Sequence, residues 1–289
     1  MGDTAPIGVF DSGIGGLSIL KALGAALPLE RFVYFADSAH NPYGEKSDVF
    51  VIDRSRAITR QLVQEHSIKA LVVACNTATA AAIHRLRAEH PGLPIIGVEP
   101  ALKPAVSASK TKRIAVLATH GTLQSAKFAS LLASLQGQAE FICIAGEGLA
   151  EQIERSIEHS PGQQNATKLI AACAYSAMAC GSFGAKNGQI DTLVLGCTHY
   201  PLVLPYFRQA VGPAVHIVDN GQAVARRTQQ LLADHQTAAL PTHNQSDGQS
   251  DDLSDSQAGK PSTQARLTLL TSADNITLQH AAKRFLTAK

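Results

Sequence analysis

The sequence carries little charge and no long apolar run. Its 289 residues include 25 Lys and Arg against 23 Asp and Glu, a formal net charge of +2, and the basic residues are scattered. We therefore expect no nucleic acid partner and no binding to an anionic membrane surface. No segment reaches the ~18 apolar residues of a membrane-spanning helix, and the first residues lack the basic and apolar regions of a signal peptide.

Tryptophan is absent, aromatic residues make up 5% of the chain, and there are only five cysteines. An odd number of cysteines without close spacing argues against a disulfide framework and against a structural zinc site, so we expect no metal ion. Hydrophobic residues nevertheless make up 45% of the sequence, which is enough for one large core or two. These features are typical of a soluble globular protein of the reducing cytoplasm.

Short apolar runs rich in β-branched residues alternate with segments of helical periodicity. This rhythm predicts an α/β fold built from doubly wound parallel sheets. The runs expected to form strands lie at residues 7–10, 32–36, 70–74, 94–98, 113–118, 140–144, 192–195 and 215–218.

We expect two similar lobes with the active site in the cleft between them. The first lobe comprises residues 1–99 and 210–289, and the second comprises residues 100–209. Ser, Gln, Asp, Gly and Pro dominate residues 236–264, a composition typical of a disordered surface insertion. After it, a strand at residues 265–271 and a helix at 273–286 would return the chain to the first lobe.

Polar residues follow six of the predicted strands. In doubly wound sheets, ligands bind beyond the carboxyl ends of the strands, so these turns would line one edge. The turns are Asp11-Ser12-Gly13, residues 37–44, Cys75-Asn76-Thr77, Glu99-Pro100, residues 119–122 and Cys197-Thr198-His199.

Two of the five cysteines stand where an apolar run gives way to a polar turn. Asn, Thr and His follow Cys75 and Cys197 closely and supply hydrogen-bonding groups that a packed thiol does not require. The others, Cys143, Cys173 and Cys180, lie in apolar or Ala-rich segments, and we interpret them as core residues. Cys75 and Cys197 fall in different lobes, so they can meet only across the cleft. There they would present one acid/base group to each face of a small molecule.

The glycine-rich turn at residues 11–16 could be taken for a phosphate-binding loop. It lacks the Gly-x-Gly-x-x-Gly spacing and a Gly-Lys-Ser/Thr sequence, and Asp11 would repel a phosphate. The interpretation of Asp11 stays open between a helix cap, a partner for a substrate ammonium and a group that polarises a thiol.

Five ordered sequence blocks resemble the signatures of glutamate racemases, the cofactor-independent bacterial enzymes that interconvert L- and D-glutamate. The resemblance implies racemisation without a cofactor, D-glutamate for peptidoglycan, a cytoplasmic location and a homodimer. The blocks are Val-Phe-Asp-Ser-Gly-Ile-Gly-Gly-Leu-Ser (9–18), Tyr-Phe-Ala-Asp-Ser-Ala-His-Asn-Pro-Tyr-Gly-Glu-Lys-Ser (34–47), Val-Ala-Cys-Asn-Thr-Ala-Thr-Ala (73–80), Gly-Val-Glu-Pro-Ala (97–101) and Leu-Gly-Cys-Thr-His-Tyr-Pro (195–201).

The resemblance also implies roles for individual residues. Cys75 would take the α-proton of D-glutamate and Cys197 that of L-glutamate, each acting as the acid in the reverse direction. Asp11 matches a carboxylate that assists Cys75, and His199 matches a group that assists Cys197. The residues expected to contact the substrate are Asp11, Ser12, Tyr43, Gly44, Asn76, Thr77, Thr198 and His199.

Several alternatives stay open. The family commonly has a further glutamate after a Cys-Pro-Gly-Leu-like stretch; here that Cys-Pro is missing, and both Glu154 and the nearby Glu151 are candidates. Glu99 is either a cleft residue or part of a structural ion pair, and Tyr43-Gly44 is equally an ordinary turn. Aspartate and hydantoin racemases share the two-lobe, two-cysteine plan. A non-catalytic amino-acid-binding protein is a further reading, against which the intact cysteine pair argues.

Overall fold

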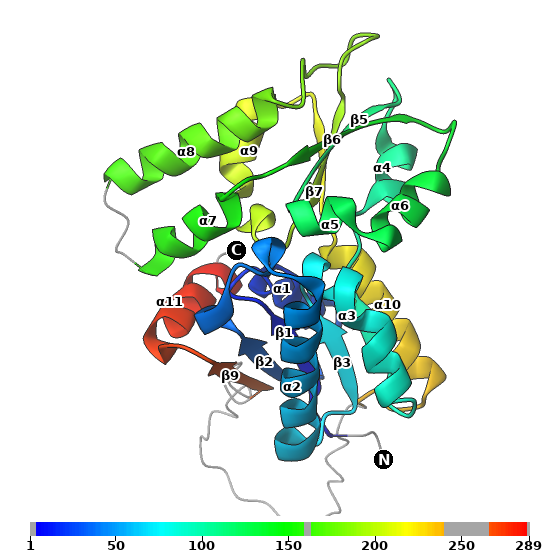
Figure 1. Ribbon diagram of the computed structural model, residues 1–289, viewed down its shortest axis with the longest axis vertical. Coiled ribbons are helices and arrows are strands. Elements are labelled where there is room, and N and C mark those ends of the chain that lie inside the picture. Colours follow the sequence, from blue (N-terminus) through cyan, green and yellow to red (C-terminus); the bar gives the residue numbers. More distant parts are fainter. Residues whose placement is uncertain (1–3, 159–162, 240–265, 288–289) are drawn as a thin grey trace, which may run out of the picture.

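The computed structural model describes residues 4–158, 163–239 and 266–287. Most of the predicted insertion at residues 236–264 lies outside these ranges. Within them, every paired strand is parallel to its neighbour, and the strands form two separate sheets, one above the other in Figure 1. The predicted α/β fold with two doubly wound parallel sheets is thus confirmed.

The first sheet has β1 at its centre. Its hydrogen-bonded order is β4 (Ile95–Gly97), β3 (Ala70–Val73), β1 (Ile7–Asp11), β2 (Phe32–Ala36) and β9 (Leu267–Thr271). All residues of β1, β2 and β3 are buried. Burial on both faces explains why these strands appear in the sequence as continuous apolar runs.

The second sheet has the order β6 (Glu140–Ala145), β5 (Arg113–Ala118), β7 (Thr192–Gly196) and β8 (His216–Val218). Both sheets match the predicted strands to within two residues at each end. One boundary needs correction, because β8 pairs with β7 although it follows residue 209. By sheet membership, the chain returns to the first lobe after Val218 and not at residue 210.

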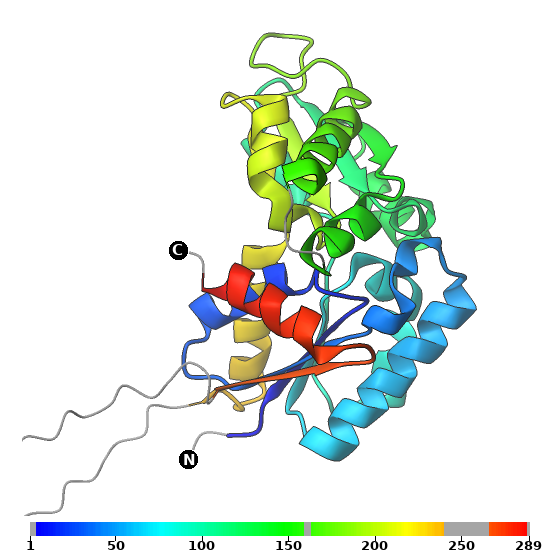
Figure 2. The ribbon, with the colours of Figure 1, turned by 90° about the vertical axis from the view of Figure 1, so that its left-hand side faces the viewer.

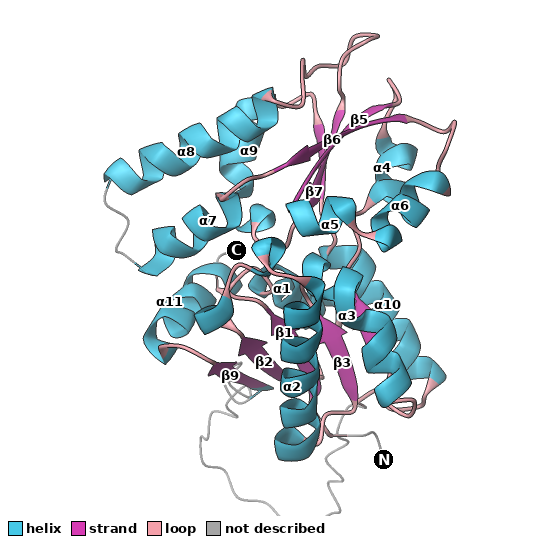
Figure 3. Cartoon of the chain, viewed as in Figure 1, coloured by secondary structure: helices cyan, strands magenta, loops and turns pink. Residues whose placement is uncertain are grey.

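Helices cover both faces of the first sheet, as Figure 3 shows. One face carries α1 (Leu17–Ala26), α10 (Gly221–Asp234) and α11 (Asn275–Leu286), whose leucines and alanines share a core with alternate residues of the strands. The opposite face carries α2 (Asp48–His66) and α3 (Asn76–Glu89) over a second core. No helix within the described ranges is long and apolar enough to cross a bilayer.

The second sheet is covered in the same way. On one face lie α7 (Leu149–Glu158), α8 (Gln163–Met178), the 3-10 turn η3 (Tyr200–Val203) and α9 (Leu204–Val211). On the other lie α4 (Leu102–Ala108) and α6 (Ala126–Ala133).

The three cysteines assigned to the core are packed there. Cys173, on α8, and Cys180 are buried in the core on one face of the second sheet, and Cys143 packs, partly buried, against the core on the other face. Cys180 lies just beyond the end of α8.

Short elements lie at the carboxyl ends of the strands. They are the 3-10 turns η1 (Ser38–His40) and η2 (Tyr43–Glu45) in the first lobe and the helix α5 (His120–Gln124) in the second, and η2 contacts α5 across the junction. Figure 2, seen from the side, shows one lobe resting on the other through this layer. The predicted polar turns therefore lie where the lobes meet.

The buried carboxylate of Asp191, just before β7, stabilises the end of the second sheet that lies away from the first lobe. Asp191 accepts hydrogen bonds from the Ser109 hydroxyl at 2.6 Å and from the backbone N–H groups of Lys110 and Thr111 at 2.7 and 2.9 Å. Burial raises the pKa of Asp191, but these bonds and one from Thr192 outweigh it and lower the pKa to about 2. Asp191 therefore holds the connection between α4 and β5 against β7.

We expect Asp191→Asn to lower the free energy of unfolding at pH 7 by about 1–3 kcal/mol, because it replaces charge-assisted bonds to a buried group. The folded pKa lies below the ~3.9 of an unfolded aspartate, so the stabilisation is complete above that value and is lost as the pH falls toward 2. Urea unfolding from pH 7 to pH 3 measures both effects. The exposed Asp53→Asn is the matched control, and equal losses in the two variants would contradict the expectation.

Candidate active site

The two predicted thiols face the junction of the lobes from opposite sides. Cys75 caps the start of α3, where its Sγ accepts the N–H of Ala78 at 3.5 Å and lies 3.9 Å from the hydroxyl of Ser12. Cys197 directly follows β7, and its Sγ lies 3.7 Å from Nδ1 of His199. Each cysteine is only 5% exposed.

The electrostatic surroundings of Cys75 favour the thiol form. Burial raises the pKa of Cys75 far above its usual range, and the nearby charges of Asp11 and Cys197 raise it further. The hydrogen bonds from Ala78 and to Ser12 oppose this rise only in part. In this closed arrangement Cys75 is a proton donor, and its thiolate, once formed, is a strong base.

Asp11 makes hydrogen bonds within its own turn and with the second lobe. Its Oδ2 accepts the N–H groups of Gly16 at 2.9 Å and Gly13 at 3.3 Å, which orders the turn before α1. Its Oδ1 accepts the hydroxyl of Thr198, from the other lobe, at 3.5 Å. Burial raises the pKa of Asp11, although the charge of His199 and the Gly16 bond oppose the rise. Asp11 therefore orders the turn that precedes α1 and connects the two halves of the site.

A buried glutamate completes the other half of the site. Oε1 of Glu154 lies 2.7 Å from Nε2 of His199 and also accepts the backbone N–H of Ile14, in the first lobe, at 2.7 Å. Burial alone would lower the pKa of His199, but its bonds to Cys197 and Glu154 raise that pKa well above the usual range. A protonated His199 can therefore donate from Nδ1 to the Cys197 sulfur.

The structure distinguishes the two candidate glutamates. Glu154 is 5% exposed and turned into the junction. Glu151 has a side chain that is 42% exposed and pairs with Arg155 at 2.6 Å. In the sequence, these two acidic residues one turn apart on a helix could not be separated without knowing which face of the helix is buried.

The glycine-rich turn allows the lobes to approach closely. A Cβ on Gly13 would lie 1.8 Å from Oε1 of Glu154, and one on Gly15 would lie 2.4 Å from Nδ1 of His199. These glycines are thus explained by the space that Glu154 and His199 occupy.

Hydroxyl groups join the lobes on the opposite side of the site. The hydroxyl oxygens of Thr77 and Thr119 lie 3.0 Å apart, and Thr119 also lies 2.9 Å from that of Thr122. A Cβ on Gly44 would lie 2.8 Å from Cβ of Thr119, so the η2 turn rests directly on the second lobe. Thr119 was not among the predicted site residues, although the polar turn that contains it was.

The remaining predicted residues lie in the same layer. Tyr43 is buried and donates its hydroxyl to Asp37. Asn76 accepts a hydrogen bond from Asn220 at 3.4 Å, and its buried Nδ2 has no hydrogen-bond partner among the described residues. This amide is a donor suited to a carboxylate. Within the described ranges, no three His, Cys, Asp or Glu side chains are grouped so that they could hold a metal ion.

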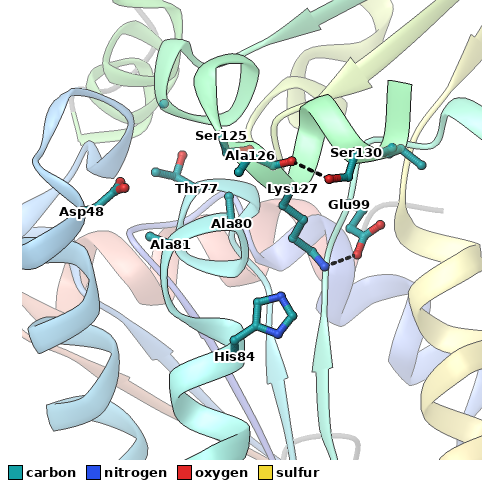
Figure 4. A pocket seen from close by; sticks show the side chains of 12 residues that line it. Asp48, Thr77, Ala80, Ala81, His84, Glu99, Ser125, Ala126, Lys127 and Ser130 are labelled. Atoms are coloured by element: carbon teal, nitrogen blue, oxygen red, sulfur yellow. Dashed lines mark hydrogen bonds and ion pairs between the residues drawn. The ribbon is translucent and has the colours of Figure 1, made fainter. Parts of the chain in front are cut away.

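A cavity of about 540 Å³ lies between α3 and α6 (Figure 4). Thr77 lines it, whereas neither Cys75 nor Cys197 does. Glu99, which follows β4 and also lines the cavity, pairs with Lys127 of α6 at 2.7 Å. Glu99 is therefore part of an ion pair between the lobes.

The comparisons agree with this geometry. The model of the Asp/Glu/Hydantoin racemase family matches residues 17–228. The chain belongs to this family. It is therefore a racemase, an isomerase that acts on amino acids, and the resemblance drawn from the five sequence blocks is confirmed.

Curated relatives and solved structures extend the match. Glutamate racemases of Ralstonia nicotianae and Ectopseudomonas mendocina are 47% and 45% identical to the chain over 229 and 235 residues. These alignments cover 79% and 81% of this chain and 78% and 85% of the relatives.

Two crystal structures of glutamate racemases share the fold. That of Bacillus anthracis has a TM-score of 0.77 at 28% identity and covers 99% of this chain and 95% of its own. That of Escherichia coli, in complex with L-glutamate and the activator UDP-MurNAc-ala, has a TM-score of 0.68 at 30% identity, with 79% and 82% covered.

We expect Glu154→Gln to lower the pKa of His199, because it removes the carboxylate that favours the imidazolium. NMR titration of the imidazole signals measures this shift. Glu151→Gln is the matched control on the same helix and should leave the pKa of His199 unchanged, because the Glu151 carboxylate pairs with Arg155 and not with His199. An identical titration of His199 in both variants would show that Glu154 does not control its charge.

Proposed function

We propose that the chain interconverts L- and D-glutamate by a two-base mechanism in which Cys75 and Cys197 are the acid/base groups, without a cofactor. The observation that carries this proposal is the placement of two buried thiols on opposite lobes, each with its own polar partner. Relatives of 45–47% identity named glutamate racemase support the choice of substrate.

The chemistry needs such a pair. The α-proton of an amino acid is very weakly acidic, so racemisation needs a strong base on one face of Cα and an acid on the other. A Cys75 thiolate takes the α-proton of D-glutamate, and the Cys197 thiol gives its proton to the opposite face, which yields L-glutamate. The reverse reaction exchanges the two roles. One proton is taken up and one released in each direction, so no external oxidant or reductant is needed.

Groups at the lobe junction suit the charges of the substrate. The hydroxyls of Ser12, Thr77 and Thr198 and the free Nδ2 of Asn76 can donate to its carboxylates. Asp11 and His199 flank the thiols and complete the set expected to bind and orient the substrate, with Tyr43 and Gly44 at the turn. Closure of the lobes excludes water, which increases the basicity of a thiolate and strengthens every polar contact inside.

We further propose that the enzyme works in the cytoplasm as a homodimer and that its D-glutamate is used to build peptidoglycan. Family membership supports this role. Growth of a bacterium that requires D-glutamate, after expression of this chain, tests the supply of the product, and light scattering of the purified protein tests the dimer.

Solvent deuterium incorporation at Cα of L- and D-glutamate, with no added cofactor, tests the mechanism. We expect deuterium in the product enantiomer with the wild type and a loss of racemisation of about 10²-fold or more in Cys75→Ser and in Cys197→Ser, because each removes an acid/base group. Cys143→Ser, which changes a packed cysteine, is the control and should keep its activity.

Two results would overturn the proposal. Exchange of L-aspartate but not of glutamate would reassign the substrate. Absence of exchange from either amino acid, combined with normal glutamate binding in both active-site variants, would indicate an amino-acid-binding protein.

The raised pKa of Cys75 predicts the pH dependence of catalysis from D-glutamate. Because the base is the thiolate, kcat/KM for D-glutamate should rise with pH through the neutral range. Asp11→Asn removes a negative neighbour that raises the pKa of Cys75, so the rise should move to lower pH even if the maximal rate falls. The exposed Asp234→Asn is the control. An unshifted profile in Asp11→Asn would mean that Asp11 carries no charge when Cys75 ionises.

A further inference from the structure

Arg54 lies on α2, outside the set of residues assigned to the site. The buried carboxylate of Asp37 nevertheless joins it to the turn at Tyr43-Gly44, here called the substrate turn. We propose that Arg54 is a positioning residue, which holds the Tyr43-Gly44 turn in its binding geometry by way of Asp37. This inference rests on the proposed function, because the turn is expected to contact glutamate.

Asp37 is the centre of the arrangement. It directly follows β2, its N–H donates to the carbonyl of Asp11 at 2.9 Å, and it has no exposed surface. Arg54 binds it with two parallel bonds, from Nε to Oδ2 at 2.9 Å and from Nη2 to Oδ1 at 2.7 Å. The two-pronged geometry fixes the orientation of the carboxylate as well as its charge.

The oriented carboxylate of Asp37 in turn fixes the position of the Tyr43 hydroxyl. This hydroxyl donates to Oδ2 of Asp37 at 2.5 Å, and the Tyr43 side chain is 1% exposed. Its ring also packs edge-on against Phe50 of α2, with centroids 6.4 Å apart. Since the Tyr43 ring enters the core beside Arg54, the adjacent Gly44 is held in place from inside the first lobe.

A neutral residue in place of Arg54 would remove the bonds that contribute most to keeping the buried Asp37 carboxylate charged. Burial raises the pKa of Asp37, and the bonds with Arg54, Tyr43, Ser272 and His40 together outweigh this effect, lower the pKa and keep the carboxylate charged. The bonds from Arg54 contribute most, and Nδ1 of His40 lies 3.0 Å from Oδ1. With Arg54 removed, His40 stays 3.0 Å from Oδ1, but the carboxylate loses two charged bonds, which favours uptake of a proton or a shift toward water. Either change weakens the acceptor on which the Tyr43 hydroxyl depends.

The position of the turn affects both lobes. Gly44 lies so close to Thr119 that a single added carbon would clash with it at 2.8 Å, and Thr119 is paired with Thr77 at 3.0 Å. A shift of the turn by a fraction of an ångström therefore changes how the second lobe closes over the residues that follow Cys75. The effect should fall on substrate binding more than on the proton transfer itself.

The same helix offers a matched control. Arg56 also forms ion pairs, with Glu89 at 2.8 Å and Asp53 at 3.7 Å. Its side chain is 33% exposed, similar to the 27% of Arg54. It differs in having no bond to Asp37 or to the substrate turn.

The experiment compares Arg54→Met and Arg56→Met by steady-state racemisation of both enantiomers. We expect Arg54→Met to raise KM about tenfold or more in each direction, with a smaller change in kcat, since bonds of this charged type commonly control at least that factor. Arg56→Met should keep the wild-type KM. Arg54→Lys should recover only part of the loss, because an ammonium cannot form both parallel bonds.

A double-mutant cycle tests the route through the tyrosine hydroxyl. If Arg54 acts through Tyr43, then Tyr43→Phe and Arg54→Met together should raise KM by less than the product of their separate effects. Multiplicative effects would overturn the proposed route, and an Arg54→Met KM equal to that of Arg56→Met would overturn the proposal. Should Arg54→Met fail to fold, the KM values of Arg54→Lys and Tyr43→Phe decide in its place.

Calorimetric titration with glutamate separates this proposal from the proposed function. If the wild type binds glutamate but does not racemise it, the proposed function fails while the weaker binding expected of Arg54→Met can still be measured. If the wild type racemises glutamate and Arg54→Met binds it as tightly as the wild type, only the positioning role fails.

Discussion

One buried oxygen, Oε1 of Glu154, links the two halves of the site. It accepts the N–H of Ile14 from the first lobe and lies 2.7 Å from the imidazole of His199 in the second. Burial of a carboxylate costs free energy unless hydrogen bonds replace those it made with water. The lobes must therefore meet closely enough for both Ile14 and His199 to bind this oxygen. The same contact holds His199 beside Cys197 and sets its charge.

The closeness of the lobes explains several otherwise unrelated features. Gly13 and Gly15 have no side chains because Glu154 and His199 occupy that space. Both thiols are almost wholly buried, and burial raises the pKa of Cys75, so that its thiolate, once formed, is strongly basic. The hydrogen bond from Thr198 to Asp11 and the one between Thr77 and Thr119 connect the lobes on both sides of the cysteines. Exclusion of water and the basicity of the Cys75 thiolate thus have the same structural cause.

Local sequence patterns predicted most of the fold. Apolar β-branched runs located the strands because parallel strands are buried on both faces and leave a continuous signal. The boundary at residue 210 was misplaced because β8 is only three residues long and its pairing with β7 depends on the second sheet being formed. Glu154 and Glu151 were indistinguishable in sequence because burial of one helix face depends on the other lobe, and Arg54 gave no local signal because its partner Asp37 lies on a different element.

The sequence by itself determined the alternation of strands and helices, the polar turns at the strand ends and the cysteine pair, since each depends on neighbouring residues and on burial within one lobe. Tertiary structure alone decided which groups meet across the junction: Glu154 with the backbone of Ile14, Asp11 with Thr198, and the turn at Gly44 with Thr119. These contacts join residues that are distant in the chain, and their strength comes from removing charged and polar groups from water, which happens only when both lobes are folded and closed on one another.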